Sequence, residues 1–199
     1  GPADTPEPLT AYGRSKLAGE AIAQTASGAM EVAIPRAPAV YGPRDRDLYQ
    51  FFRLAAHGIL PIPTGPARPL QLIHVQDLAE ALVLAATAEK AEGIFHVAEE
   101  KAYLWEHVAR MVAAAVGRDA RLVRVPAMLI RVAARVAELA NAAIGRSTIF
   151  NSDKAKELLA AGWLCETETA ARVLGFHARI PLQDGLRDTA RWYRDHGWL

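Results

Sequence analysis

A tyrosine and a lysine four residues apart, Tyr12 and Lys16 in the stretch AYGRSKLAGE, are the residues of this 199-residue chain best placed to carry out chemistry. Residues at this spacing lie on one face of an α-helix, so their side chains could share a ligand. A phenol has a reference pKa of about 10, and a nearby ammonium group favours its ionised form. The pair could act as a general acid and base on an alcohol or a carbonyl. The same spacing also occurs by chance on solvated helices, and that alternative stays open.

The elements that must position this pair alternate between strand and helix, which predicts an α/β fold with a parallel sheet. Thr10 is placed to cap a helix that runs to about Ala26, and Asp77 to cap the helix over residues 78–87. The proline-rich segment over residues 60–69 is expected to hold no regular structure, and residues 35–44 are expected to form a loop. The remaining pattern predicts strands over residues 30–34, 70–74, 93–98 and 121–125, further helices over residues 47–56, 104–116, 126–144, 152–160 and 181–195, and a short strand followed by a helix within residues 162–176.

The composition excludes several classes of function. The formal net charge is +1, from 23 basic and 22 acidic side chains, so it gives no electrostatic argument for a nucleic-acid partner or an anionic membrane. Cys165 is the only cysteine, which rules out an internal disulfide. No apolar run is long enough to span a bilayer. These features predict a soluble, cytoplasmic protein with no membrane span.

Four blocks of sequence together resemble the extended short-chain dehydrogenase/reductases, the family of NAD-dependent epimerases and dehydratases. YGRSKLAGE (residues 12–20) is similar to the family's catalytic helix. PRAPAVYGPRD (35–45) is similar to its strand and loop beside the nicotinamide, with Ala37 where a second proline is usual. LIHVQDLAEAL (72–82) resembles the following strand and helix, and residues 171–199 resemble the closing segment. Their joint occurrence, in the family's order, is far more specific than the tyrosine and lysine alone.

The resemblance implies an NAD(P)-dependent oxidoreductase, or an epimerase or dehydratase, that acts on a carbonyl or alcohol. Tyr12 matches the catalytic residue that gives or takes the proton, and Lys16 matches the residue that binds the ribose hydroxyls and assists the tyrosine. Pro38 matches a position that packs against the nicotinamide of NAD or NADP. The positions that match the substrate-lining loop are Ala39, Val40, Tyr41 and Arg44. No metal site is predicted, because the histidines show no convincing metal spacing.

Two of the family's features have no match in these 199 residues: the glycine-rich dinucleotide fingerprint and a catalytic Ser or Thr. The chain is therefore expected to be the C-terminal portion of an extended reductase. It would hold an incomplete Rossmann-like parallel sheet (about 9–44 and 70–98) and a C-terminal, mostly helical substrate-binding lobe (about 45–69 and 99–199). Cofactor binding by this portion alone is not expected. A non-catalytic binding or assembly module derived from the family remains the alternative.

The expected partners are a small-molecule substrate and a second copy of the chain. An apolar alcohol or ketone is favoured over a nucleotide sugar, because residues 70–72 lack the arginine usual in relatives that act on such sugars. Arg68 lies slightly upstream of that stretch. A homo-oligomer is expected because the strand over residues 30–34 would present an unpaired edge. The helix before that strand would also expose an apolar stripe.

Three further features have both a structural and a functional interpretation, and the structural one is favoured for each. His74 beside Asp77 could be a catalytic base, but such a turn also joins a strand to a helix. Cys165 could be a reactive thiol, but it has no flanking cation. The helix over residues 126–144 has one apolar side and could dock on a membrane, but such a helix more often covers a core or an apolar pocket.

Overall fold

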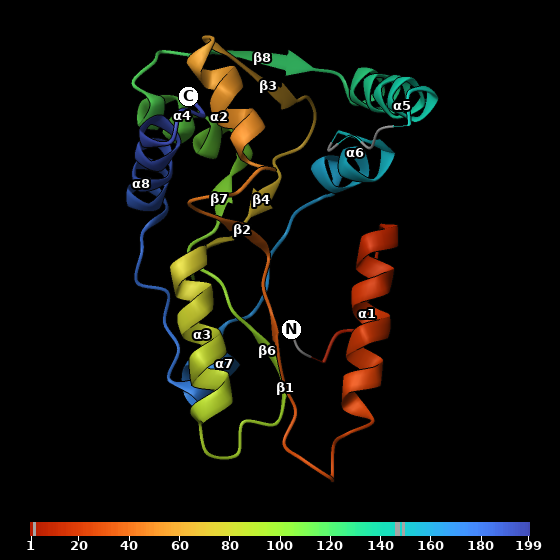
Figure 1. Cartoon of the computed structure of the whole chain (residues 1–199), viewed down its shortest axis with the longest axis vertical. Helices are drawn as coiled ribbons and strands as arrows, with labels where there is room; N and C mark the ends of the chain where they lie inside the picture. The colour runs from red at the N-terminus through yellow and green to blue at the C-terminus, as the bar shows by residue number, and fades with distance from the viewer. Residues whose placement is uncertain (2, 146–147, 149) are drawn as a thin grey trace.

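The structure is a computed structural model that describes residues 1, 3–145, 148 and 150–199 (Figure 1). The helices are α1 (Ala11–Gln24), α2 (Tyr49–Ala56), α3 (Val75–Thr87), α4 (Trp105–Val116), α5 (Ala127–Ala143), α6 (Ser152–Leu159), α7 (Glu168–Leu174) and α8 (Leu182–Asp195). The strands are β1 (Ala33–Arg36), β2 (Ala39–Tyr41), β3 (Ile59–Pro63), β4 (Pro69–Leu70), β5 (Leu72–His74), β6 (Gly93–His96), β7 (Tyr103–Leu104) and β8 (Arg121–Val125). The α/β class is confirmed.

The strands form two-stranded pairs, and most of these pairs are parallel. β1 pairs with β6, β2 with β5 and β3 with β8 in parallel, whereas β4 and β7 are antiparallel. The expected parallel pairing is therefore present, but as small separate sheets rather than one continuous sheet. A bend at residues 37–38 divides β1 from β2, and each of these two strands pairs with a different partner.

The buried side chains fall into two main clusters. In Figure 1 the lower half of the molecule holds β1 and β6 with α3 and α7, and the upper half holds α2, α4, α8, β3 and β8. The lower cluster contains Ile73, Ala81, Ala91, Phe95, Val97, Ala170, Leu174 and Phe176. The upper cluster includes Tyr41, Phe52, Leu60, Leu72, Val108, Val112, Leu182, Leu186 and Tyr193. The proposed division between a Rossmann-like remainder and a lobe stays a prediction, and α7 packs against β6 although the division places it in the lobe.

Two segments expected to be irregular are strands. Residues 39–41 form β2, and residues 59–63 form β3 despite prolines at positions 61 and 63. The Thr64 backbone N–H donates to the Val125 carbonyl, and the Gly58 carbonyl accepts from the Arg121 N–H. In a parallel ladder, the backbone N–H and C=O groups of the even-numbered residues of β3 therefore point toward β8, and the nitrogen atoms of the two prolines point to the other side. A proline that faces away from the only partner strand removes no ladder hydrogen bond.

The expected cap of α3 is also corrected. His74, not Asp77, is the N-cap residue, and its Nδ1 accepts a hydrogen bond from the Gln76 backbone N–H at 3.3 Å. The Asp77 carboxylate instead accepts from the backbone N–H groups of Arg179 and Ile180, about a hundred residues later. The structural interpretation of His74 is therefore supported, and Asp77 fixes the segment that leads into α8.

Smaller differences lie at the ends of elements. β1 begins at Ala33 rather than Met30. The short strand expected before α7 is a single bridge between Leu70 and Trp163. The predicted strand over residues 121–125 and the cap of α1 at Thr10 are confirmed, whereas Pro126, expected in the first turn of its helix, is the N-cap residue just before α5. The helices described by the structure include none with the length and apolarity needed to cross a membrane.

Candidate active site

The N-cap of α1 places Tyr12 and Lys16 on one face of that helix. The Thr10 hydroxyl accepts a hydrogen bond from the Gly13 backbone N–H at 3.0 Å, which starts the helix at Ala11. Tyr12 then lies in the first turn and Lys16 in the next. The Lys16 Nζ atom is 5.9 Å from the centroid of the Tyr12 ring, so the expected proximity of the two side chains is present.

Both side chains are accessible. The Tyr12 side chain is 69% exposed, and Lys16 is exposed as well. No hydrogen bond or ion pair within the described ranges engages the Tyr12 hydroxyl or the Lys16 ammonium. A ribose hydroxyl and a carbonyl oxygen are groups that such donors could bind.

Polar contacts near both ends attach α1 to the rest of the protein. No residue of α1 is fully buried. The Ala11 backbone N–H donates to the Asp153 carboxylate of α6 at 3.0 Å, and in Figure 1 the first turn of α1 points toward α6. Near the other end, Glu20 forms an ion pair with Arg36 of β1. These contacts set the direction in which the Tyr12 face points.

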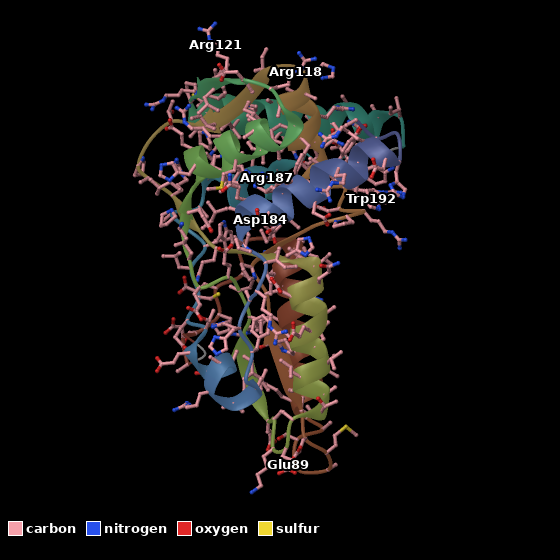
Figure 2. All side chains as sticks on the ribbon, turned by 90° about the vertical axis from the view of Figure 1, so that its left-hand side faces the viewer. Glu89, Arg118, Arg121, Asp184, Arg187 and Trp192 are labelled. Carbon is pink, nitrogen blue, oxygen red and sulfur yellow. The ribbon has the colours of Figure 1, made fainter. Side chains whose placement is uncertain are left out.

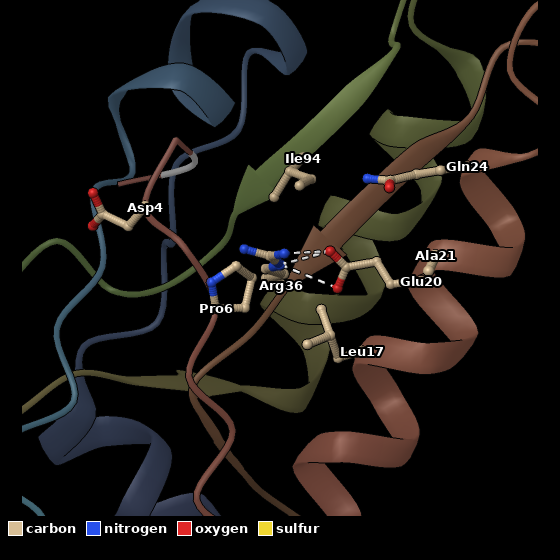
Figure 3. Close-up of a pocket in the computed structure, with 8 residues that line it drawn as sticks. All are labelled: Asp4, Pro6, Leu17, Glu20, Ala21, Gln24, Arg36 and Ile94. Atoms are coloured by element: carbon tan, nitrogen blue, oxygen red, sulfur yellow. Dashed lines mark hydrogen bonds and ion pairs between the residues drawn. The ribbon is translucent and has the colours of Figure 1, made fainter.

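A half-open cavity of about 240 Å³ lies between α1 and the β1–β6 pair (Figure 3). It is lined by Asp4, Pro6, Leu17, Glu20, Ala21, Gln24, Arg36 and Ile94. The Glu20–Arg36 ion pair spans it, as the dashed lines in Figure 3 show. Neither Tyr12 nor Lys16 lines this cavity, so it is a gap in the packing beneath α1 and not the place where the reacting groups would meet a substrate.

The positions that match the nicotinamide contact and the substrate loop differ in exposure. Pro38, at the bend before β2, is partly exposed, and Ala39 and Val40 are exposed on β2. Arg44 is exposed in a turn and has a φ of 73°, in the left-handed region that non-glycine residues seldom adopt. Tyr41 is only 1% exposed. Four of the five positions are therefore accessible, while Tyr41 is part of the upper cluster.

Tyr41 contacts His74 and α8 inside the protein. The two rings meet edge to face with centroids 5.3 Å apart, and a side chain at Gly185 would collide with the Tyr41 ring. Burial raises the pKa of the Tyr41 hydroxyl far above its usual range, with Glu99 and Asp77 acting in the same direction. Burial lowers the pKa of His74. Both groups are therefore neutral near pH 7 and suit packing better than proton transfer.

Gln71 has a structural role that sequence reasoning missed. Its Nε2 donates to the carbonyl oxygens of Glu99 and Glu100 at 3.0 and 3.3 Å, and its Oε1 accepts from the Cys165 backbone N–H at 2.7 Å. Arg68 is half-buried, and its guanidinium contacts carbonyl oxygens of its own loop. These two polar side chains near residues 70–72 are therefore engaged by backbone groups. The sequence held no local signal for the Gln71 contacts, which join segments about 28 and 94 residues away.

The described residues offer few groups that could hold a metal ion. Over the residues that the structure describes, no three His, Cys, Asp or Glu side chains gather as a metal site would require. Burial raises the pKa of the Cys165 thiol, which therefore stays protonated near pH 7.

Comparison with known proteins gives a family match over most of the chain. Residues 1–143 match the model of the RmlD substrate binding domain. A curated relative called "Ceramide reductase", from Caulobacter vibrioides, is 32% identical over 194 residues, which cover 96% of this chain and 59% of the relative. The chain spans less than two thirds of the length of the curated relatives that it matches.

Solved structures show the same fold. An epimerase from Methanothermobacter thermautotrophicus matches with a TM-score of 0.74 at 18% identity, over 97% of this chain and 52% of the epimerase. A dTDP-glucose 4,6-dehydratase from Streptomyces venezuelae, solved with NAD and TYD bound, matches with a TM-score of 0.72 at 20% identity, over 99% of this chain and 55% of the dehydratase. The chain therefore has about half of an NAD-dependent epimerase or dehydratase fold.

Proposed function

Because this chain belongs to the RmlD substrate binding domain family, we propose that it is part of an NAD(P)-dependent oxidoreductase in which Tyr12 transfers the proton and Lys16 assists it. The observation that carries this proposal is the geometry of α1. Two exposed groups, a phenol and an ammonium, share one helix face with 5.9 Å between the ammonium nitrogen and the ring centroid. Both are free, in the part of the chain that the structure describes, to bind a ligand.

Each of these residues has a distinct role in the proposed reaction. The nicotinamide, when bound, supplies or accepts a hydride at the substrate carbon. In the reducing direction, the Tyr12 hydroxyl donates its proton to the carbonyl oxygen as that oxygen becomes an alcohol. The Lys16 ammonium stabilises the phenolate that remains and binds the ribose hydroxyls. Pro38, at the partly exposed bend before β2, would lie against the nicotinamide ring.

The substrate that this geometry favours is an apolar ketone or alcohol, with lipid as the chemical class. Arg68 Nη1 and Gln71 Nε2 already donate to backbone carbonyls, which disfavours their use in binding the phosphates of a nucleotide sugar. The name of the curated relative, a ceramide reductase, supports a lipid substrate. Ala39 and Val40, which are exposed on β2, would contact its apolar part, and Arg44 would contact its polar end.

The test uses the longer protein that contains this chain, because the chain spans about half of the proteins it resembles. Tyr12→Phe removes the proton donor and is expected to lower kcat for reduction of a lipid ketone by about 10²- to 10⁴-fold. The readout is NADH or NADPH absorbance. Arg14→Gln is the matched control, since Arg14 is exposed on another side of the same helix and the change should leave kcat unaltered. Undiminished turnover in Tyr12→Phe would refute the assigned proton donor.

A binding or assembly role without catalysis is the second outcome that this test can reveal. It would show as tight binding of a lipid or a partner chain by a protein that does not turn over with NADH or NADPH. Calorimetric titration of NAD and NADP separates the two functions. An oxidoreductase binds at least one of them, and a non-catalytic module binds neither.

A further inference from the structure

The helix α5 packs through a narrow side that holds Ile130 and Ala134 and turns most of its large apolar side chains outward. Ile130 and Ala134 are buried, and they form a cluster with Ala155 of α6. The opposite side carries five large apolar side chains that are each at least half exposed: Met128 (73%), Leu129 (58%), Val132 (50%), Val136 (60%) and Leu139 (55%). We call this set the outer stripe of α5.

This orientation is the reverse of that expected for a surface helix, whose apolar side normally faces the core. The apolar side of residues 126–144 was expected to cover a core or a pocket, and in the described part of the protein it covers neither. A contiguous exposed apolar face of this kind marks an interaction site. The outer stripe therefore needs a partner with an apolar surface.

The charges around the outer stripe are basic. Arg131 and Arg135 are exposed and lie along one edge of the stripe, as the 100° step per residue requires. The only acidic residue of α5, Glu138, accepts a hydrogen bond from the Ser152 hydroxyl of α6 and also forms an ion pair with Arg135 at 3.5 Å, so Arg131 is the basic residue of α5 with no acidic partner among the described residues. Arg118 and Arg121, just before and at the start of β8, project from the upper end of the molecule (Figure 2), and β8 separates them from α5 (Figure 1).

We propose that α5 docks flat on a membrane surface that contains anionic lipids. The outer stripe would enter the boundary between headgroups and acyl chains, and Arg131 and Arg135 would contact lipid phosphates. A helix of 17 residues is about 26 Å long and lies in the interface without crossing it. Basic residues along the edge of an apolar stripe are complementary to an anionic lipid surface, and this complementarity selects the partner.

A second copy of the chain fits this surface less well. Pairing two outer stripes would bring two copies of Arg131 and Arg135 together, and the one acidic residue of α5, Glu138, already pairs with Arg135 of its own helix and leaves a net positive charge on α5. Like charges placed close together in an interface oppose association. The inference does not depend on the oxidoreductase proposal, although a lipid substrate would be delivered at such a surface.

The test measures binding of the purified protein to vesicles by co-sedimentation. Vesicles of phosphatidylcholine alone are compared, at the same lipid concentration, with vesicles that contain about 30% phosphatidylglycerol. We expect the protein to bind the anionic vesicles and to release them as NaCl is raised from about 0.1 to 0.5 M. Val136→Asp should weaken this binding at least tenfold, and the double change Arg131→Gln and Arg135→Gln should remove its dependence on salt.

The matched control is Val83→Asp, because Val83 is 61% exposed in the middle of α3 and lies outside the outer stripe. It should leave vesicle binding unchanged, and thermal unfolding of each variant checks that the fold is kept. Absence of binding to either vesicle type would overturn the proposal, as would equal losses in Val83→Asp and Val136→Asp. Light scattering that shows a dimer dissociated by Val136→Asp, without vesicle binding, would assign the outer stripe to a second copy instead.

Discussion

Arg36 of β1 and Glu20 of α1 form an ion pair that is largely shielded from solvent, with 23% and 13% of their side chains exposed. The Arg36 Nε atom donates to both carboxylate oxygens, at 3.0 and 3.2 Å. Since no residue of α1 is fully buried, this pair links the helix that carries Tyr12 to the strand that leads toward the substrate loop. The orientation of the proposed proton donor therefore depends on a polar contact more than on a packed core.

Breaking that pair should loosen α1. Glu20→Gln is expected to lower the free energy of unfolding by about 1–2 kcal/mol, between the values for exposed and buried pairs. Amide hydrogen exchange in α1 should accelerate more than exchange in α8. Glu31→Gln is the control, because Glu31 is exposed and lies outside both α1 and β1. Equal exchange rates in α1 for the parent and Glu20→Gln would show that the helix is held by other contacts.

Gly185 lies so close to Tyr41 that a larger residue at position 185 is expected to clash with the Tyr41 ring. A Cβ atom at Gly185 would lie 2.9 Å from Tyr41 Cε2 and closer still to the hydroxyl oxygen. Gly185→Ala should therefore destabilise the protein by about 1–3 kcal/mol, although alanine normally favours a helix interior. At Gly19, mid-helix in α1, a Cβ atom would meet nothing within 4 Å. Gly19→Ala is therefore expected to stabilise the protein by up to about 1 kcal/mol.

A double-mutant cycle identifies which atoms cause the clash. The Tyr41 hydroxyl is buried and has no hydrogen-bond partner within the described residues, so Tyr41→Phe alone should cost little. Combined with Gly185→Ala, it should recover part of the lost stability, with a coupling of about 0.5–3 kcal/mol. Chemical denaturation of the four proteins gives the coupling. Strict additivity would mean that α8 shifts to relieve the contact.

His74 predicts how stability changes with pH. Burial lowers its pKa in the folded protein, against the opposing influence of Asp77 and Asp188. The unfolded chain, with an ordinary histidine pKa of about 6.5, binds a proton that the folded protein excludes. The contribution of His74 to the free energy of unfolding should therefore be fully present above about pH 6.5 and should be lost as the pH falls below that point.

The variant His74→Asn separates this effect from other titrations. Asparagine can also accept the capping hydrogen bond from the Gln76 N–H but does not titrate. The loss of stability between pH 7.5 and 5 should be smaller in His74→Asn than in the parent. Burial also lowers the pKa of His96, so some dependence should remain. His57→Asn, at an exposed histidine, should behave like the parent, and an unchanged pH dependence in His74→Asn would count against the role of His74.

Cys165 should react slowly with thiol reagents. Burial raises the pKa of its thiol, so little thiolate is present near neutral pH. We expect its reaction with a chromogenic disulfide at pH 7.5 to be at least about tenfold slower in the folded protein than in guanidinium chloride. Similar rates in the two conditions would show that the thiol is accessible and activated.

The predictions from sequence succeeded where the signal was local. The hydroxyl of Thr10 and the ring of Pro126 mark helix starts that the structure confirms, because a cap acts within its own first turn. β3 was missed because prolines argue against a strand, unless their nitrogen atoms are known to face away from the partner strand, where no hydrogen-bond donor is needed. Which way they face depends on the position of β8, some 60 residues later. For the same reason the sequence showed the two sides of α5 but not which of them would be packed.

In the candidate site, too, features set by local sequence could be predicted, and features set by distant contacts could not. The proximity of Tyr12 and Lys16 follows from a spacing of four residues on a helix, and the sequence was enough to predict it. The burial of Tyr41 depends on Gly185, and the contacts of Gln71 depend on Cys165. Neither partner is near in sequence, so no local pattern could indicate that these two side chains are unavailable to a substrate.

The position of α8 has a consequence for biosynthesis. This helix supplies Leu182, Leu186 and Tyr193 to the upper cluster, and the Tyr193 hydroxyl donates to the carbonyl of Asp45, which leaves the ribosome 148 residues earlier. Until α8 is translated, the early part of that core has no cover and its apolar side chains stay exposed to other nascent chains. Contacts this distant in sequence also fold slowly. The protein should therefore depend on chaperones during translation more than a helical protein of equal length does.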